Sequence, residues 1–178
     1  MLCIPLMPLE SGRLAKVDAR DFWWLAGLAW RESNGYAVYQ TVDANGGRTT
    51  LFMHRLILDA PDGMDTDHID GDGTNNCRSN IRICTTQQNM WNRKKAARTS
   101  RGAGMASRYK GVAYRADRPR RPWKAKICIN GRSTLLGIFV TEQEAALAYD
   151  AAARQHFGAF ACTNFPLPGE RPALSDVA

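Results

Sequence analysis

The sequence of 178 residues lacks an apolar run that could cross a membrane. The run FWWLAGLAW at residues 22–30 ends after nine residues, whereas a spanning helix needs about 20. The N-terminus has neither a basic lead nor a cleavage site, so we expect no secretion signal. Cysteine is also scarce: there are five, and no two form a C-x-x-C motif. This favours reduced thiols in a cytosol over a disulfide framework or a zinc knuckle.

Acidic residues are nearly absent from residues 78–132, which contain 16 lysines and arginines but a single acidic residue, Asp117. The flanking segments are acidic: residues 1–77 have a net charge of −5 and residues 133–178 of −3, within a total of +7. Fifteen uncompensated positive charges in one segment would repel one another in a compact domain. We therefore expect a polyanionic partner. Nucleic acid is favoured over an anionic membrane surface because no basic amphipathic helix accompanies the charge.

Composition divides the chain into four parts. Residues 1–93 hold apolar clusters followed by a polar block, and residues 94–108 are a basic linker with few large apolar groups. Residues 109–166 form a second small domain, and residues 167–178 are a tail that contains proline. In the first part we expect a short helix around Asp21–Leu28 and then two or three antiparallel strands.

The second domain allows a more detailed prediction. Asn130-Gly131 lies between two alternating runs, which predicts a hairpin with a type I′ turn that pairs Ile129 with Arg132. That register assigns side chains to two faces. One face would hold Trp123, Ala125, Ile127, Ile129, Thr134, Leu136 and Ile138. The other would hold Lys124, Lys126, Cys128, Ser133, Leu135 and Gly137. The sequence YKGVAYR, from Tyr109, predicts a third strand.

A helix is predicted directly after this hairpin. Thr141 and Glu144 have the spacing of a capping box, and Gly158 is placed to end the helix. An alanine-rich stripe would lie on the apolar sheet face; it consists of Ala145, Ala148, Tyr149, Ala152 and His156. The lysine face of the sheet would remain open, as in a domain that binds a DNA groove.

The most unusual stretch is MDTDHIDGDGTNNCRSNIRICTTQQNMWNR, residues 64–93. So many aspartates and asparagines are typical of a loop, yet NIRIC alternates like a strand and TTQQNMWNRKK resembles a helix start. Phosphodiester cleavage needs a base, a cation and a rigid frame near one phosphate. His68 offers the base. Asp67 and Asn89 offer oxygen ligands of the kind that a hard cation such as Mg²⁺ takes.

Two resemblances cover roughly residues 4–166. The block MHRLIL…DHIDGDGTNNCRSNIRICTTQQNMWNR resembles HNH endonucleases of the phage and homing type, and the lead-in IPL…GRLAKVDARDFWWL resembles the start of phage-type proteins that join the two modules. The second domain resembles the DNA-binding domain of the plant APETALA/ethylene-response-factor family, with GV, LGIF, EAALAYDAAA and NFP in their places. The implied fold class is α+β: a small ββα-metal nuclease core plus a three-stranded antiparallel sheet backed by one helix.

The first resemblance implies a role for each polar residue. His68 would be the general base, and Asp67 would bind the metal. Asn80 would be the central asparagine that pins the loop and so orients His68. Asn89 would be the last metal ligand, on the helix. The family often has histidine there, so asparagine favours one weakly held hard cation, Mg²⁺ or Mn²⁺, and argues against zinc. His54 fits two roles equally: packing at a helix start, or a contact to a phosphate or to the site residues.

Double-stranded DNA is the expected partner, and several basic residues are expected to contact it: Arg93, Lys94, Lys95, Lys110, Arg115, Lys124 and Lys126. Arg93 fits a solvated charge equally well. By resemblance, Lys110, Arg115 and Lys126 stand at base-contact positions, and Lys124 would add a phosphate contact. Other contact positions hold residues where the plant family often has arginine or tryptophan, so the recognised sequence must differ; these are Ala113, Cys128, Ser133 and Leu135.

The sequence therefore predicts a site-directed DNA endonuclease of the homing type, which nicks or cuts both strands with one divalent metal. The rival hypothesis, from another class, is a DNA-binding regulator whose nuclease core is only a scaffold. Retention of all four polar residues argues against that rival; they are Asp67, His68, Asn80 and Asn89. The resemblance implies a phage or mobile element that acts in a bacterial cytoplasm, with no membrane partner.

Overall fold

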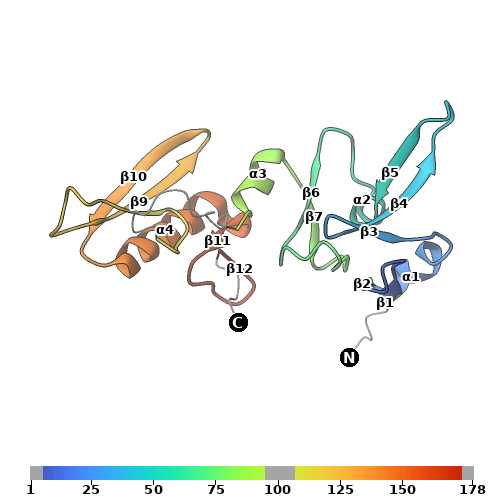
Figure 1. Cartoon of the computed structure of the whole chain (residues 1–178), viewed down its shortest axis with the longest axis horizontal. Helices are drawn as coiled ribbons and strands as arrows, with labels where there is room; N and C mark the ends of the chain where they lie inside the picture. The colour runs from blue at the N-terminus through green and yellow to red at the C-terminus, as the bar shows by residue number, and fades with distance from the viewer. Residues whose placement is uncertain (1–5, 95–106, 174–178) are drawn as a thin grey trace. The chain divides into compact units, whose positions relative to one another are not determined.

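The computed structural model describes residues 6–94 and 107–173, and the chain folds as two compact units, residues 1–89 and 90–178 (Figure 1). The fold is mixed α and β, with small sheets and short helices apart from one longer helix. The first unit contains β1 (Leu6–Pro8), β2 (Leu14–Lys16), α1 (Ala19–Leu25), β3 (Arg31–Ser33), β4 (Tyr36–Val42), β5 (Arg48–Phe52), α2 (Met53–Leu58), β6 (Asp65–His68) and β7 (Ile81–Cys84). Helix α3 (Thr86–Trp91) spans the boundary between the units.

The second unit continues with β8 (Val112–Tyr114), β9 (Trp123–Ile129), β10 (Arg132–Phe139), α4 (Glu142–Phe157), the 3-10 helix η1 (Gly158–Phe160), β11 (Cys162–Thr163) and β12 (Arg171–Pro172). Most of the predicted basic linker, including Lys95, and the last five residues of the tail lie outside the described residues.

One apolar core holds the first unit together. Strands β1 and β2, helices α1 and α2, and the start of β7 all contribute to it. Trp30 is buried at its centre, and its indole nitrogen donates to the carbonyl oxygen of Leu25 at 2.9 Å. The predicted helix around Asp21–Leu28 is α1, which starts earlier and ends at Leu25. The predicted antiparallel strands are confirmed as the sheet β3–β4–β5.

The strand expected from NIRIC is also confirmed. It is β7, which pairs with β6 in antiparallel fashion, so that Asp67 lies opposite Arg82 and His68 opposite Ile81. Helix α3 begins two residues after β7 ends. Arg55, on α2, fixes the chain that leads into β6, because its guanidinium donates to the carbonyl oxygens of Ala60, Pro61 and Met64. A hairpin followed by a short helix is thereby anchored to the core of the first unit.

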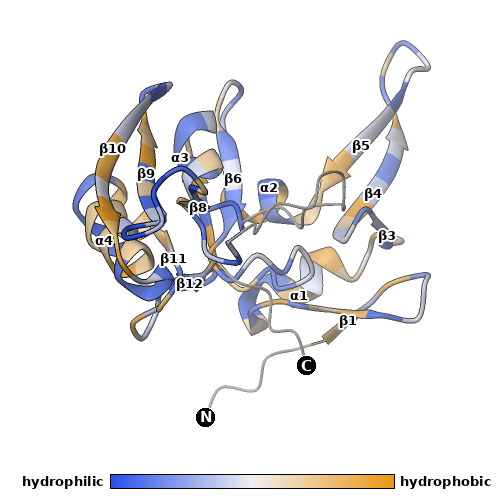
Figure 2. Cartoon of the chain, turned by 60° about the vertical axis from the view of Figure 1, so that its left-hand side comes forward, coloured by the Kyte–Doolittle hydropathy of each residue, from blue (hydrophilic) through white to orange (hydrophobic). Residues whose placement is uncertain are grey.

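The second unit is a three-stranded antiparallel sheet in the order β10–β9–β8, with α4 packed along one face of β9 and β10 (Figure 1). The predicted hairpin register is confirmed, since Ile129 pairs with Arg132. Figure 2 shows the turn between β9 and β10 as hydrophilic and the strands as mixed. The capping box is confirmed as well: the Thr141 hydroxyl accepts from the Glu144 amide at 3.2 Å, and Glu144 accepts from the Thr141 amide at 3.1 Å.

The predicted faces are wrong beyond Leu136, which packs into the core as predicted, because the register shifts at this residue. After a β-bulge at Leu136, Gly137 pairs with Ala125 and Ile138 pairs with Lys124. Gly137 therefore lies on the helix-covered face and Ile138 on the lysine face, the reverse of the prediction. A side chain at Gly137 would clash with the Phe139 ring, whose Cζ lies 2.8 Å from the position that a Cβ would take. The glycine makes room for Phe139 to join the core.

The buried stripe of α4 also differs in part from the prediction. Ala145 and Tyr149 are buried as expected, and Ala148 and Ala152 pack at the edge of the core. His156 is exposed, and the neighbouring Phe157 is buried in its place. A helix turns 100° per residue, so a one-position error in the stripe exchanges a covered for an exposed side chain.

Two further contacts explain motifs at the ends of this unit. Gly111 has a φ of 76°, and a Cβ there would fall 1.9 Å from Cδ2 of Tyr149, so the close approach of α4 requires glycine. Asn164, in the NFP motif, accepts from the Lys110 amide at 2.6 Å and donates to Asp150 at 3.0 Å. Asp150 is fully buried and also accepts from the Phe165 amide at 2.7 Å. The motif ties the chain end to α4 and to the start of the sheet.

Candidate functional site

Asp67, which is buried, and Arg82, which is half-buried, form an ion pair across the β6–β7 hairpin. Asp67 is 4% exposed, and its Oδ2 accepts from Nε of Arg82 at 2.9 Å and from Nη2 at 2.7 Å. The two residues are cross-strand partners, which is why their side chains meet. Arg82 holds the orientation of the carboxylate and offsets its charge. The sequence-based prediction named Asp67 but gave no role to Arg82.

His68 is buried beside a second asparagine rather than beside Asn80. Its Nε2 lies 3.1 Å from Oδ1 of Asn76, which is itself fully buried. The Asn76 amide nitrogen donates to the carbonyl oxygen of Thr74 at 3.2 Å, which turns Oδ1 toward the imidazole. Burial lowers the pKa of His68, while the contact with Asn76 and nearby aspartates raises it. The lower pKa keeps the ring neutral and able to accept a proton near neutral pH.

Asn80 holds the loop between β6 and β7. Its Nδ2 donates to Oδ1 of Asp70 at 2.8 Å and to the carbonyl oxygen of Asn75 at 2.8 Å, while its Oδ1 accepts from the Asp70 amide at 3.1 Å. Asn75 is directly followed by Asn76, so fixing Asn75 also fixes the residue that contacts His68. Asn80 therefore pins the loop, and its influence on His68 passes through Asn76. Sequence reasoning missed that residue, although the repeated asparagine was visible.

Short polar turns and a neighbouring strand brace the same loop. Oδ1 of Asp72 accepts from both the amide and the hydroxyl of Thr74, at 2.9 and 2.7 Å. Lys16, in β2, donates its amide to Thr74 at 2.9 Å and accepts from the Asn76 amide at 2.8 Å. Because these bonds hold the backbone at Thr74 and at Asn76 itself, they fix the part of the loop that presents Asn76 to His68.

Asn89 lies beside a carboxylate that the sequence-based prediction omitted. Its Nδ2 donates to Oδ2 of Asp65 at 3.1 Å. Asp65 and Asp67 are two positions apart on β6, so their side chains lie on the same side of the strand. The alternation of DTD within a strand was the available signal. The structure thus brings Asn89 to the hairpin side that carries both aspartates.

The donor set on this side fits a hard divalent cation. It consists of carboxylate and amide oxygens from Asp65, Asp67 and Asn89, which Mg²⁺ and Mn²⁺ prefer. Within residues 6–94 and 107–173, no three His, Cys, Asp or Glu side chains gather into a cluster that could hold a metal. A cation such as Mg²⁺ keeps several waters and needs only one or two protein groups, so a sparse donor set suits it.

His54, at the start of α2, lies against His68. The ring centroids are 4.7 Å apart and the rings meet at 78°. Tyr36 and Phe52 complete the aromatic surroundings of His54, at 5.6 and 5.5 Å. His54 is 5% exposed, and its Nδ1 has no hydrogen-bond partner within the described part of the chain. Burial lowers the pKa of His54 to about 3, and both His68 and Arg55 add to that effect.

The basic residues expected to bind DNA have different environments. Arg93 and Lys94 are exposed, as is Lys126, while Lys124 is half-buried. Lys110 is engaged inside the second unit: its Nζ donates to the carbonyl oxygens of Trp91 at 2.8 Å and Arg93 at 2.7 Å. Burial lowers the pKa of Lys110.

Arg115 is paired as well. Its Nε donates to Oδ1 of Asp117 at 3.0 Å, and its Nη2 donates to Oδ2 of the same carboxylate. Both groups are at the surface, so solvent weakens the pair. Lys124 and Lys126 remain the basic side chains of β9, and the proximity of Lys126 lowers the pKa of Lys124.

A known family is similar to this hairpin in sequence. Residues 59–91 match the family described as HNH endonuclease. The matched stretch, called the HNH segment below, includes Asp65, Asp67, His68, Asn80 and Asn89. The chain is also 32% identical over 133 residues to an uncharacterized HNH endonuclease of Acanthamoeba polyphaga mimivirus; the match covers 74% of this chain and 63% of that protein.

Other relatives match a smaller share of the chain. An AP2-like ethylene-responsive transcription factor of Arabidopsis thaliana is 39% identical over 77 residues, which is 42% of this chain and 21% of that protein. An AP2/ERF and B3 domain-containing protein of Oryza sativa subsp. japonica is 44% identical over 72 residues, or 38% and 19%. The chain thus spans less than two thirds of each of these proteins. In the described ranges, none of the helices has both the length and the apolar character that crossing a membrane requires.

Proposed function

We propose that this protein is a DNA endonuclease that hydrolyses phosphodiester bonds with His68 as general base and one hard divalent cation. The observation that carries the proposal is the ordered set of Asp67, His68, Asn80 and Asn89 around one hairpin within the HNH segment. Each of these residues alone has an ordinary structural explanation. Their joint placement in one hairpin, with a buried imidazole next to Asp67 in sequence and further oxygen donors on the same hairpin, supports this reaction.

The contact with Asn76 supports one tautomer of neutral His68. With the oxygen of Asn76 directed toward Nε2, the neutral ring would carry its hydrogen on that nitrogen and its lone pair on Nδ1. Nδ1 is then the nitrogen that would take a proton from the attacking water. Asn80 supports this step at a distance, since it fixes the loop that carries Asn76.

Asp67 and Asn89 would hold the cation, and Asp65 stands beside them as a further oxygen donor. When bound, a hard cation supplies positive charge that stabilises the charge developing on the phosphate. Arg82 would keep Asp67 in place while it binds. The acidic side chains of this region would otherwise repel DNA, so the cation would also make the site compatible with a phosphate.

Site-directed cleavage of the homing type requires a second contact with DNA. Two observations support it: the outer sheet face of the second unit is basic, including Lys124 and Lys126, and 42% of the chain is similar to a plant AP2-like ethylene-responsive transcription factor. We propose that this unit binds double-stranded DNA and directs the nuclease to its site.

The test is incubation of the full-length protein with supercoiled plasmid, with Mg²⁺, with Mn²⁺ and with EDTA. We expect nicked or linear product with either metal and none with EDTA. Cleavage that is indifferent to EDTA would contradict the metal assignment. Tight DNA binding without cleavage under any of these conditions would favour the non-catalytic regulator.

A further inference from the structure

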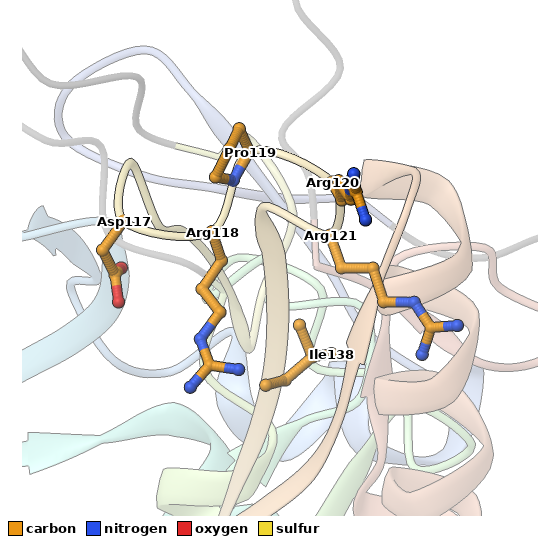
Figure 3. A pocket seen from close by; sticks show the side chains of 6 residues that line it. All are labelled: Asp117, Arg118, Pro119, Arg120, Arg121 and Ile138. Carbon is orange, nitrogen blue, oxygen red and sulfur yellow. The ribbon is translucent and has the colours of Figure 1, made fainter.

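The loop between β8 and β9 surrounds an open hollow of about 520 Å³. The hollow is lined by Asp117, Arg118, Pro119, Arg120, Arg121 and Ile138 (Figure 3). The loop is held in shape by its own backbone: the Arg115 amide donates to Pro122 at 2.7 Å and the Arg121 amide donates to Arg118 at 3.1 Å. We call the arginines, Pro119 and Ile138 of this hollow the arginine hollow. Its shape follows from a defined loop rather than from side chains alone.

The β-bulge at Leu136 gives the hollow its apolar floor. Without the bulge, Ile138 would point under α4, as the alternation of the hairpin predicts. With the bulge, Ile138 pairs with Lys124 and shares its face of the sheet. Figure 3 shows the side chains of Arg118 and Arg121 on either side of Ile138. An apolar group is therefore flanked by two guanidinium groups on the lysine face.

The arginines of the hollow carry an excess of positive charge, although the carboxylate of Asp117 attracts Arg118 as well as Arg115. Within residues 6–94 and 107–173, the side chains of Arg118, Arg120 and Arg121 take part in no hydrogen bond or ion pair. Both carboxylate oxygens of Asp117 accept hydrogen bonds from Arg115, so much of the negative charge of Asp117 is already offset. By contrast, arginines elsewhere bind carboxylates directly; examples are Arg78, Arg82 and Arg154. Three like charges in four residues indicate an anionic ligand from outside.

The combination of guanidinium and apolar groups in the hollow favours one kind of anion over others. Guanidinium groups match phosphate in geometry, but a free phosphate would make no use of Ile138 and Pro119. A nucleic-acid strand presents both an anionic and an apolar group, because each phosphate is joined to sugars whose carbon atoms form an apolar surface. We propose that the arginine hollow binds the sugar-phosphate backbone of DNA, independently of sequence, and so anchors the sheet. This inference rests on the proposed binding of DNA by the second unit.

The test uses the full-length protein and two short DNA duplexes of unrelated sequence. Binding isotherms are measured at several salt concentrations for wild type and for the double variant Arg118→Ala/Arg121→Ala. We expect the variant to lose affinity equally for both duplexes, with the salt slope lowered by about 0.9 for each lost phosphate contact. The matched control is Arg20→Ala/Arg48→Ala, which removes two exposed arginines from the first unit and should change the slope less.

A second variant tests the floor of the hollow. Ile138→Glu places a carboxylate between the two arginines, and we expect it to weaken binding to both duplexes at least as much as the double variant. Thermal melting checks that each variant is folded; Ile138 is only half-buried and lies away from the α4 face.

Each outcome bears on the inference. If wild type binds DNA and the double variant binds with the same affinity and slope, the arginine hollow is not a DNA contact, while DNA binding by the protein stands. A loss confined to one duplex would mean that these arginines recognise bases, which also overturns the inference. If wild type binds vesicles of anionic phospholipid but neither duplex, both this inference and the proposed function fail.

Discussion

Around β6 and β7 in the first unit, charged and amide side chains bind one another, whereas Lys126 on β9 and the arginines of the hollow in the second unit are exposed to solvent. Asp67 is bound by Arg82, Asn80 holds Asp70, and His68 contacts Asn76. Lys126 and the arginines of the hollow have no comparable protein partners within the described ranges. Side chains that bind one another inside the protein hold each other in one orientation. Charged side chains that face solvent are available to bind a ligand of opposite charge.

The two regions therefore suit two different tasks: catalysis in the first unit and DNA binding in the second. A reacting group must be held within fractions of an ångström, which buried hydrogen bonds achieve. A phosphate contact tolerates more freedom, because its attraction is long-range and sums over many charges. We therefore expect variants in the first unit to change cleavage and variants on the outer sheet to change affinity.

The largest effect is expected at Asn89. Asn89→Ala removes a proposed oxygen ligand and also leaves Asp65 without its amide contact. We expect no detectable cleavage at low Mg²⁺ and partial recovery at high Mg²⁺, measured as plasmid nicking across a magnesium titration. The control is Asn45→Ala, an exposed asparagine in the β4–β5 turn. Equal activity of both variants at low Mg²⁺ would remove Asn89 from the metal site.

The next effect is expected at His68. His68→Ala removes the proposed proton acceptor, and we expect the cleavage rate to fall by about 100-fold or more while DNA affinity stays nearly unchanged. His156→Ala serves as the matched control, because His156 is exposed on α4. Single-turnover cleavage and binding isotherms give the two readouts. A variant that cuts at the normal rate would show that His68 is not the base.

These regions also differed in how well the sequence predicted them. The register at Ile129 and Arg132 and the capping box of α4 followed from local chemistry, because a two-residue turn and a fixed spacing leave few alternatives. The bulge at Leu136 did not follow, because it depends on where Phe139 finds room in the core. Beyond that point, two side chains were assigned to the wrong faces.

The candidate site was predicted in its residues more than in its contacts. Asp67, Asn80 and Asn89 lie around the same hairpin as His68, as expected. The contact of Asn76 with His68, and the ion pair of Arg82 with Asp67, depend on how the strands are paired and the loop is folded. No local pattern in the sequence predicts which side chains will pair in this way.

Acid should destabilise the first unit through His54. The pKa of His54 is about 3 in the folded protein, against 6.5 for an ordinary histidine. Between these values the unfolded chain binds a proton that the folded protein does not, so stability falls as pH falls. The contribution of His54 is at most about 1.4 kcal/mol per pH unit in that window.

The variant His54→Phe isolates this contribution. Phenylalanine keeps an aromatic ring among Tyr36, Phe52 and His68 but cannot bind a proton. We expect its free energy of unfolding to fall less steeply than that of wild type between pH 6.5 and 4, as measured by urea denaturation. Protonation of carboxylates changes the stability of both proteins equally. Parallel curves of unfolding free energy against pH would therefore show that His54 is not held neutral.

The smallest effect should separate two lysines that the sequence treated alike. Nζ of Lys110 donates to the carbonyl oxygens of Trp91 and Arg93, so Lys110→Ala should lower the melting temperature of the second unit. Lys126 is exposed on the outer face of β9, so Lys126→Ala should leave the melting temperature unchanged. It should instead weaken DNA binding and, if it contacts a phosphate, lower the salt slope by about one unit. Melting curves and isotherms at several salt concentrations measure both properties. The reverse pattern, with Lys110 controlling the slope and Lys126 the melting temperature, would mean that the outer sheet face does not contact DNA.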